Sequence, residues 1–160
     1  MSAYTEALAR EGDAQPLRPF TDRDHPNAVK LKEAHEAFQR GDLDALFGLM
    51  ADDIVWHMPG NNVLAGSFRG RAAIMESFGA LQANVDAYWA WPLDYFGSDD
   101  HVVLVALVRA RRGERTLETK ECLLWRVDAA GKLAEVWHMA LDEKAWDAFF
   151  QGDLPPPPPI

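Results

Sequence analysis

The apolar residues of this chain change their spacing between Leu81 and Val85, and this change constrains the fold more than any other feature. Before Leu81 most of them recur every three or four positions, as on one face of an α-helix. From Val85 onward many alternate with polar residues, as on a half-buried β-strand. Helices followed by a run of strands are typical of an α+β domain, in which helices pack on one face of an antiparallel sheet.

Two helices are expected early in the chain. The first begins at His25 or Asn27 and ends before Gly41, which suits the position after a helix C-terminus. Its apolar stripe is Leu31, Ala34, His35 and Phe38. Asp42 then caps a short second helix. The apolar positions of that helix are Leu43, Leu46, Phe47 and Met50.

A third helix is expected after a short strand and a loop. The strand is the β-rich run Asp53–Met58, which Pro59 stops. The loop Asn61–Arg69 leads to the helix, which begins at Gly70. Its apolar stripe is Ile74, Phe78 and Leu81.

Four strand-like runs follow, and a helical segment, Glu143–Phe150, closes the domain. The runs are Val85–Gly97, His101–Arg112, Thr116–Val127 and Leu133–Leu141. Strict alternation in the first run puts one set of residues on a single face: Val85, Ala87, Trp89, Trp91, Leu93 and Tyr95. Pro92 lacks a backbone donor and so predicts an edge strand or a bulge there.

The two ends of the chain have a different composition from the centre. Residues 1–25 are polar, contain two prolines and show little periodicity, which indicates an N-terminal arm. The run Pro155–Pro159 predicts polyproline II or irregular structure in a tail over 151–160, because proline has no backbone donor. We expect one domain, over residues 26–150, since 160 residues leave little room for a second.

Charge and composition exclude several classes of partner. The chain has 16 basic and 25 acidic residues, a net charge of −9, so it repels nucleic acid and anionic lipid; we expect neither as a partner. No stretch resembles a secretory signal or a membrane-spanning helix, and Cys122 is the only cysteine. We therefore expect a cytoplasmic protein.

Several segments in order resemble the nuclear transport factor 2-like superfamily. They are the stretch from Phe38 to Leu46, then Ala51–Gly60, Leu64–Ile74 and Gly131–Trp137, and the last two point to the SnoaL-like branch. This resemblance covers about residues 26–150. It implies a cone-shaped, half-open barrel: three N-terminal helices on a curved, mostly antiparallel sheet, with a short C-terminal helix and a deep apolar pocket. It also implies a homodimer formed through the sheet.

Ketosteroid isomerase is one member of this superfamily, and its catalytic groups are absent here. Alignment of the shared landmarks puts Met58 at the position of its general base. Ala34 falls at its oxyanion-hole tyrosine, and Leu123 near its protonated aspartate. Because none of these three side chains can exchange a proton, the chain does not carry that catalytic constellation.

The same comparison implies which side chains of the strand that contains Glu121 point toward the pocket. It puts Leu117, Thr119, Glu121, Leu123 and Trp125 toward the pocket. A carboxyl group among apolar neighbours has a raised pKa, which suits proton transfer near neutral pH. The alternative is that Glu121 forms an ion pair with Arg109 or another cation on a neighbouring strand.

Three histidines are further catalytic candidates. His57 points outward by strict alternation, but a bulge before Pro59 would turn it inward. His138 and its neighbour Trp137 point to opposite faces of their strand, and the sequence leaves open which of the two faces the pocket. His35 shares the apolar stripe of the first helix and can reach the pocket from the other side.

The substrate-binding candidates are mostly aromatic, because six tryptophans in a chain of this size belong either to a packed core or to an aromatic-lined cavity. Asn61 and Asn62 are added as polar anchors in the loop at the barrel mouth. The complete set is Trp56, Met58, Asn61, Asn62, Trp89, Trp91, Leu123, Trp125 and Trp137. No spacing of His, Cys and acidic residues fits a metal site, and no glycine motif fits a nucleotide cofactor, so we expect neither.

These observations predict a small enzyme that uses acid–base catalysis on a hydrophobic small molecule, without a cofactor. The reaction types that fit are those of a cyclase, isomerase, dehydratase or epoxide hydrolase. The alternative is a non-catalytic ligand-binding or dimerisation domain of the same fold.

Overall fold

Most of the described helices precede the change of apolar spacing, and four of the six described strands follow it. The computed structural model describes residues 24–152. Its helices are α2 (Pro26–Gln39), α3 (Leu43–Phe47), α4 (Gly70–Ala83) and α5 (Glu143–Phe149). Its strands are β1 (Met50–Met58), β2 (Gly66–Arg69), β3 (Ala87–Gly97), β4 (His101–Arg112), β5 (Arg115–Val127) and β6 (Leu133–Ala140). The expected α+β order is confirmed.

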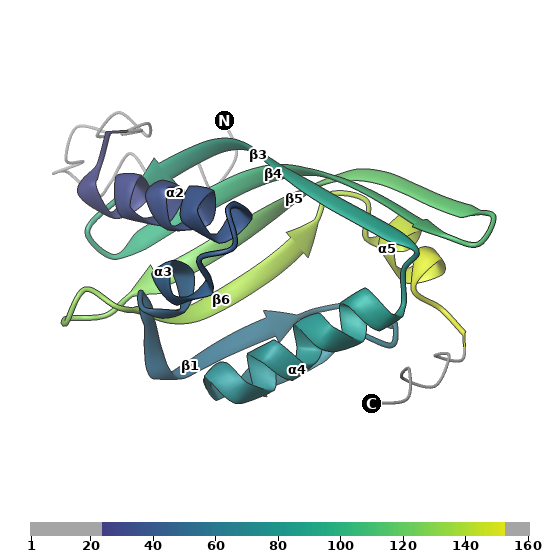
Figure 1. Ribbon diagram of the computed structural model, residues 1–160, viewed down its shortest axis with the longest axis horizontal. Coiled ribbons are helices and arrows are strands. Elements are labelled where there is room, and N and C mark those ends of the chain that lie inside the picture. The colour runs from purple at the N-terminus through teal and green to yellow at the C-terminus, as the bar shows by residue number, and fades with distance from the viewer. Residues whose placement is uncertain (1–23, 153–160) are drawn as a thin grey trace, which may run out of the picture.

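The six strands form one curved sheet in the order β2-β1-β6-β5-β4-β3. All neighbouring pairs are antiparallel except β1 and β6, which run parallel. Figure 1 shows the sheet curling so that α2, α3 and α4 lie on its concave side, while α5 lies at one end. β2 and β3 form the two edges, so the barrel is open, as the resemblance implied.

The helix boundaries follow the capping residues. Asp42 Oδ1 accepts the Ala45 backbone N–H at 3.1 Å, which confirms the expected cap of α3. The expectation that this helix extends through Met50 is wrong. α3 ends at Phe47, and Met50 is the fully buried first residue of β1.

The predicted loop Asn61–Arg69 contains a short strand. Residues 66–69 form β2, which pairs with residues 55–58 of β1. Three of the four residues of β2 are exposed. Since no apolar alternation marks this segment, the sequence pattern did not predict the strand.

Pro92 marks both an edge strand and a bulge. The register of β3 against β4 shifts between Pro92 and Asp94, which leaves Leu93 as an extra residue. The bulge turns the residues after it to the other face. Tyr95 is therefore buried on the inner face opposite Leu104, whereas strict alternation had put it with Trp89 and Trp91.

The core fills the space between the concave face of the sheet and the helices. Its fully buried members come from both layers, for example Leu31 of α2, Ile74 of α4 and Trp125 of β5. A second cluster gathers around Trp146 and Phe150 at the end of the chain. The two clusters leave a cavity between them and the helices.

The expected arm and tail lie almost wholly outside the described residues. This holds for residues 1–23 of the arm and 153–160 of the tail. None of the helices within residues 24–152 is long and apolar enough to cross a membrane.

Candidate active site

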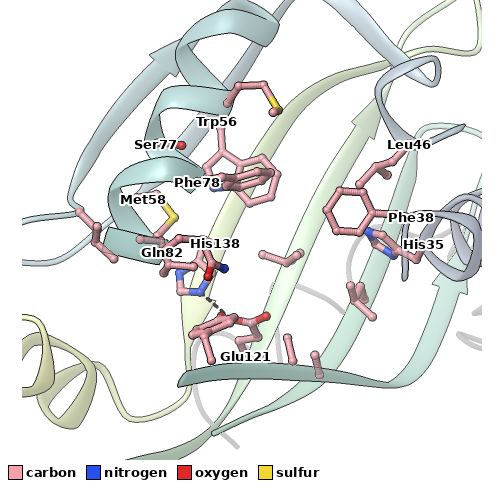
Figure 2. Close-up of a pocket in the computed structure, with 18 of the residues that line it drawn as sticks. His35, Phe38, Leu46, Trp56, Met58, Ser77, Phe78, Gln82, Glu121 and His138 are labelled. Atoms are coloured by element: carbon pink, nitrogen blue, oxygen red, sulfur yellow. Dashed lines mark hydrogen bonds and ion pairs between the residues drawn. The ribbon is translucent and has the colours of Figure 1, made fainter. Parts of the chain in front are cut away.

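A large cavity lies between the inner face of the sheet and the helices. Its volume is about 580 Å³, within the roughly 300–1,000 Å³ typical of pockets for small organic molecules. Its wall is mostly apolar and aromatic, and Figure 2 shows Phe38, Trp56 and Phe78 around it. The cavity therefore suits an apolar organic molecule.

Two buried ionisable side chains meet on the wall of this cavity. His138 Nε2 lies 2.8 Å from Glu121 Oε2, and each side chain is only 6% exposed. Figure 2 marks the contact with a dashed line. The hydrogen-bond donor is either the ring N–H of His138 or the O–H of a protonated Glu121 carboxyl group. The pair can therefore exchange a proton with a molecule in the cavity.

The register of β5 and β6 brings this pair together. Leu123 lies opposite His138, and Glu121 lies opposite Ala140. Glu121 and His138 are thus diagonal neighbours on the same face of the sheet. The ring of Trp146 from α5 packs on His138, with 4.7 Å between ring centroids. This contact shields the imidazole from water.

Glu121 does not pair with Arg109, the first partner considered for it; its partner on a neighbouring strand is His138. Arg109 Nε donates to Glu118 Oε2 at 2.6 Å, and both of these side chains are exposed. Of the described residues that line the cavity, only Glu121 is a carboxylate and none is lysine or arginine. Within this set, histidine is therefore the only side-chain type that can carry a positive charge opposite the Glu121 carboxylate.

Tyr88 of β3 adds a phenol near Glu121. Burial, and then the negative charge of Glu121, raise the pKa of Tyr88 well above its ordinary value of 10.0. Its hydroxyl therefore stays protonated at neutral pH and can donate a hydrogen bond. Tyr88 packs with the cluster around Trp146, which also contacts His138.

His35 of α2 lies at the other side of the cavity, away from Glu121 and His138 in Figure 2. Its Nδ1 is 3.0 Å from Tyr95 Oη. Burial lowers the pKa of His35 from 6.5 to about 4, so the ring is neutral at pH 7. Burial, and then the charge of Glu36, raise the pKa of Tyr95 to about 12. Both groups are therefore uncharged hydrogen-bonding groups.

The aromatic wall between these two polar ends is tightly organised. Trp56 meets Trp125 edge to face, with 5.3 Å between ring centroids and 87° between planes. Phe78 meets the other side of Trp56 in the same way, at 5.2 Å and 88°. Met58 and Leu123 also line the cavity, so four of the expected binding residues lie in its wall. Their role in binding a substrate stays a prediction.

His57 lies outside the cavity, which corrects its place among the catalytic candidates. β1 is regular from Val55 to Met58, so no bulge turns His57 inward. Its Nδ1 is 2.8 Å from Ser67 Oγ, and its Nε2 is 2.9 Å from Glu135 Oε1. His57 therefore belongs to a polar network on the outer face of the sheet.

Three of the expected binding tryptophans also face away from the cavity. Trp89 and Trp91 stack on each other and are 50% and 43% exposed. Trp137 stacks on His57 with 5.5 Å between ring centroids. Of the two neighbours on β6, His138 faces the cavity and Trp137 faces outward. These three tryptophans lie on the outer face because their strands alternate.

Asn61 and Asn62 hold the loop after β1 and do not line the cavity. The Asn61 backbone N–H and the Asn62 side-chain amide both donate to the Asp147 carboxylate of α5. Asn62 Oδ1 accepts the Leu64 backbone N–H at 2.9 Å. The loop places Leu64, and not the two asparagines, in the cavity wall.

Sequence reasoning missed Tyr88 as a cavity residue and Tyr95 as the residue that holds His35. Tyr88 alternates with Trp89, and the outward position of Trp89 would have revealed it. Tyr95 follows the Leu93 bulge, which reverses the alternation; Pro92 predicted an edge strand or a bulge there, but strict alternation was kept for the residues after it. Within residues 24–152, no group of three or more His, Cys, Asp or Glu side chains could hold a metal ion.

Comparison with known families extends these observations. The sequence model of a SnoaL-like domain matches residues 31–136. An uncharacterised protein of Mycobacterium tuberculosis is 30% identical over 122 residues, which cover 75% of this chain and 92% of the relative. The same values hold for an uncharacterised protein of Mycobacterium bovis.

Solved structures with the same architecture include proteins of several kinds. Bal32a, from a soil-derived mobile gene cassette, is 28% identical, with a TM-score of 0.72 over 81% of this chain and 100% of its own. TerC, co-crystallised with polyporic acid, has a TM-score of 0.67 at 18% identity, over 79% and 99% of the two chains. IdmH, a putative polyketide cyclase from Streptomyces antibioticus, has a TM-score of 0.57 at 23% identity, over 74% and 94%. The last two likenesses concern the fold alone.

Proposed function

The chain belongs to the SnoaL-like family, and we propose that it is an enzyme that transfers protons within an apolar organic molecule bound in the cavity. The family includes polyketide cyclases and isomerases. The observation that carries the proposal is the 2.8 Å contact between His138 and Glu121. A buried acid–base pair on the wall of an apolar cavity is the arrangement that proton transfer requires.

Glu121 is the proposed base. Its Oε2 is held by His138, and within the described residues its Oε1 has no hydrogen-bond partner. Oε1 is thus the atom available to take a proton from a carbon next to a carbonyl group. The electrons of the broken C–H bond form an enolate. The Tyr88 hydroxyl is the proposed donor to the enolate oxygen.

The fate of the enolate defines the reaction. Return of the proton to a different carbon gives an isomer. Attack of the enolate carbon on a second carbonyl closes a ring, and the proton that Glu121 removed is then transferred to the new alkoxide oxygen. Loss of a β-hydroxyl as water, with the proton supplied by the Glu121–His138 pair, gives a dehydration. Opening of an epoxide by water would use the same pair as base and acid. None of these steps changes the oxidation state of the molecule as a whole, so none needs a redox cofactor.

Exchange of carbon-bound protons tests this proposal without knowledge of the natural substrate. 2-Tetralone, a bicyclic aromatic ketone, exchanges the protons next to its carbonyl with D₂O, and mass spectrometry measures the rate. We expect the protein to accelerate exchange and Glu121→Gln to lower the rate constant by roughly 10²- to 10⁴-fold. Glu118→Gln is the matched control, because Glu118 lies on the same strand but is exposed.

The outcome that contradicts the proposal is equal exchange by the two variants. Native mass spectrometry of the freshly purified protein is a second measurement, since a retained small molecule would identify the ligand class directly. Retention of such a molecule with no effect of Glu121→Gln on exchange would favour the alternative, a ligand-binding domain without catalysis.

We also propose that two copies pair through the outer face of the sheet. Trp91 and Met139 are both 43% exposed on that face, and Trp89 is 50% exposed. In Figure 1 the helices α2, α3 and α4 all lie on the opposite face. An exposed apolar sheet face supports an interface between like surfaces.

A further inference from the structure

The inner face of the sheet carries a polar group at each end of one cross-strand row. The row runs Tyr95, Leu104, Leu123 and His138 across strands β3, β4, β5 and β6. Three strand spacings of about 4.8 Å put the backbones of Tyr95 and His138 roughly 14 Å apart before curvature. Only apolar residues lie between them, so the cavity floor is a long apolar strip with polar ends.

The Tyr95 end presents an imidazole to the cavity. Tyr95 Oη and His35 Nδ1 are 3.0 Å apart, and the His35 ring packs against Trp125 with 6.3 Å between ring centroids. These two contacts fix the ring plane. They leave Nε2 as the His35 atom without a hydrogen-bond partner among the described residues. His35 lines the cavity, so this nitrogen is open to a hydrogen bond from a ligand or from water.

We propose that His35 is a second anchor that binds a neutral oxygen at the end of the ligand farthest from Glu121. This inference rests on the proposed function, because it assumes that the other end of the same molecule meets the Glu121–His138 pair. The ligand class that follows is an elongated, largely aromatic molecule with a hydroxyl or carbonyl oxygen at each end.

The charges around the cavity favour a neutral oxygen at His35. The described residues that line the cavity include no lysine or arginine, so a carboxylate or phosphate would find no cation there. Burial lowers the pKa of His35, so its imidazole carries no positive charge at neutral pH. Tyr95, whose pKa burial raises, holds the ring by an uncharged hydrogen bond. Hydroxyl and carbonyl groups are the partners that such a site can satisfy.

A pair of rod-shaped probes tests the second anchor. 4,4′-Dihydroxybiphenyl has a hydroxyl at each end, whereas 4-hydroxybiphenyl has one. Isothermal titration calorimetry at pH 7 measures the affinity of each. We expect the wild type to bind the diol roughly 3- to 10-fold more tightly. His35→Leu should remove the preference for the diol and keep the affinity for 4-hydroxybiphenyl. His35→Gln retains a hydrogen-bonding side chain, so it should show part of the preference for the diol.

The results that overturn the inference are distinct from those that overturn the proposed function. A diol preference that persists in His35→Leu, or that is absent from the wild type, overturns the role of His35. Failure of the wild type to bind either probe also overturns the ligand class. Glu121→Gln keeps a hydrogen-bonding side chain, so it should abolish proton exchange on 2-tetralone but leave the diol preference intact. Unchanged exchange in that variant contradicts the proposed function alone.

Discussion

The Asp147 carboxylate of α5 accepts a hydrogen bond from the Asn62 side-chain amide at 2.6 Å. Asp147 also accepts the backbone N–H of Asn61. The loop after β1 is therefore tied to the last helix. Because this loop carries Leu64 into the cavity wall, the tie stabilises one side of the candidate site.

Loss of the Asp147 carboxylate should loosen this loop. We expect Asp147→Ala to lower the free energy of unfolding by about 1–2 kcal/mol, because two donors lose a charged acceptor at a partly exposed position. Urea denaturation measures the change. Glu143→Ala is the control, since Glu143 is exposed on the same helix. An equal effect of the two substitutions would contradict the assignment.

Gly60 offers a sharper test of the same contact. It has φ +110°, and a Cβ added there would collide with Asp147 Oδ1. We expect Gly60→Ala to destabilise the protein, and to do so less in the Asp147→Ala background, where the backbone strain and the close approach to Asn62 Nδ2 remain. Urea denaturation of the wild type, the two single variants and the double variant completes a double-mutant cycle. Strict additivity would refute the contact.

Burial of His35 predicts a dependence of stability on pH. The pKa of His35 is about 4 in the folded chain and 6.5 as its ordinary value. The unfolded chain therefore binds an extra proton between these pH values, and this residue lowers stability as the pH falls through that window. Between pH 7 and pH 5 the wild type should lose about 2 kcal/mol more than His35→Gln. Urea denaturation at both pH values measures the difference, and parallel losses would show that His35 is not buried.

The outer-face network predicts a titration shift. The hydrogen bond from His57 is the main cause of the lowered pKa of Glu135, and Arg126 contributes next among the lowering causes. Glu135 therefore adds stability above its ordinary pKa of 4.5, which is lost as the pH falls through the lower folded pKa. In His57→Ala the carboxyl titration of Glu135, followed by carbon-13 NMR, should move upward. His35→Gln should leave it unchanged, and no movement in His57→Ala would contradict the prediction.

The proposed dimer predicts an effect of charge on the outer face. Trp91→Lys or Met139→Lys should weaken self-association on the order of ten-fold or more, because a buried unpaired lysine is costly at an interface. Sedimentation equilibrium measures the change. Val29→Lys is the control, since Val29 is 37% exposed on α2. A wild type that is monomeric at all concentrations would refute the dimer.

Most of the fold could be predicted because its signals are local. The capping residue Asp42 places the start of α3, and the period-2 runs place strands β3 to β6 with ends near those observed. β2 could not be predicted because Gly66–Arg69 is short and mostly exposed. The family resemblance, confirmed by the SnoaL-like match over residues 31–136, supplied the overall topology.

The candidate site was less predictable because alternation gives relative faces and not absolute ones. Along β6 it showed that Trp137 and His138 oppose each other, but only the pairing with β5 puts His138 beside Glu121. Aromatic residues are usually buried, so Trp89 and Trp91 were assigned to the cavity although they lie on the outer face. Which residues of two strands come into contact depends on the register between the strands. The sequence of one strand alone does not determine that register.

The extra residue at Leu93 reverses the alternation of side chains along β3, so the large side chains of its two halves lie on opposite faces of the sheet. Residues before it, such as Trp89 and Trp91, present their large side chains to the outside, while Tyr95 after it is buried on the inner face, where its hydroxyl contacts His35. If both proposals hold, we expect substitutions before Leu93 to alter self-association and substitutions at Tyr95 to act on His35 separately. Deletion of Leu93 would place Asp94 directly after Pro92, opposite Val105, so both sets of side chains would keep their present faces and the strand would lose only its local bend.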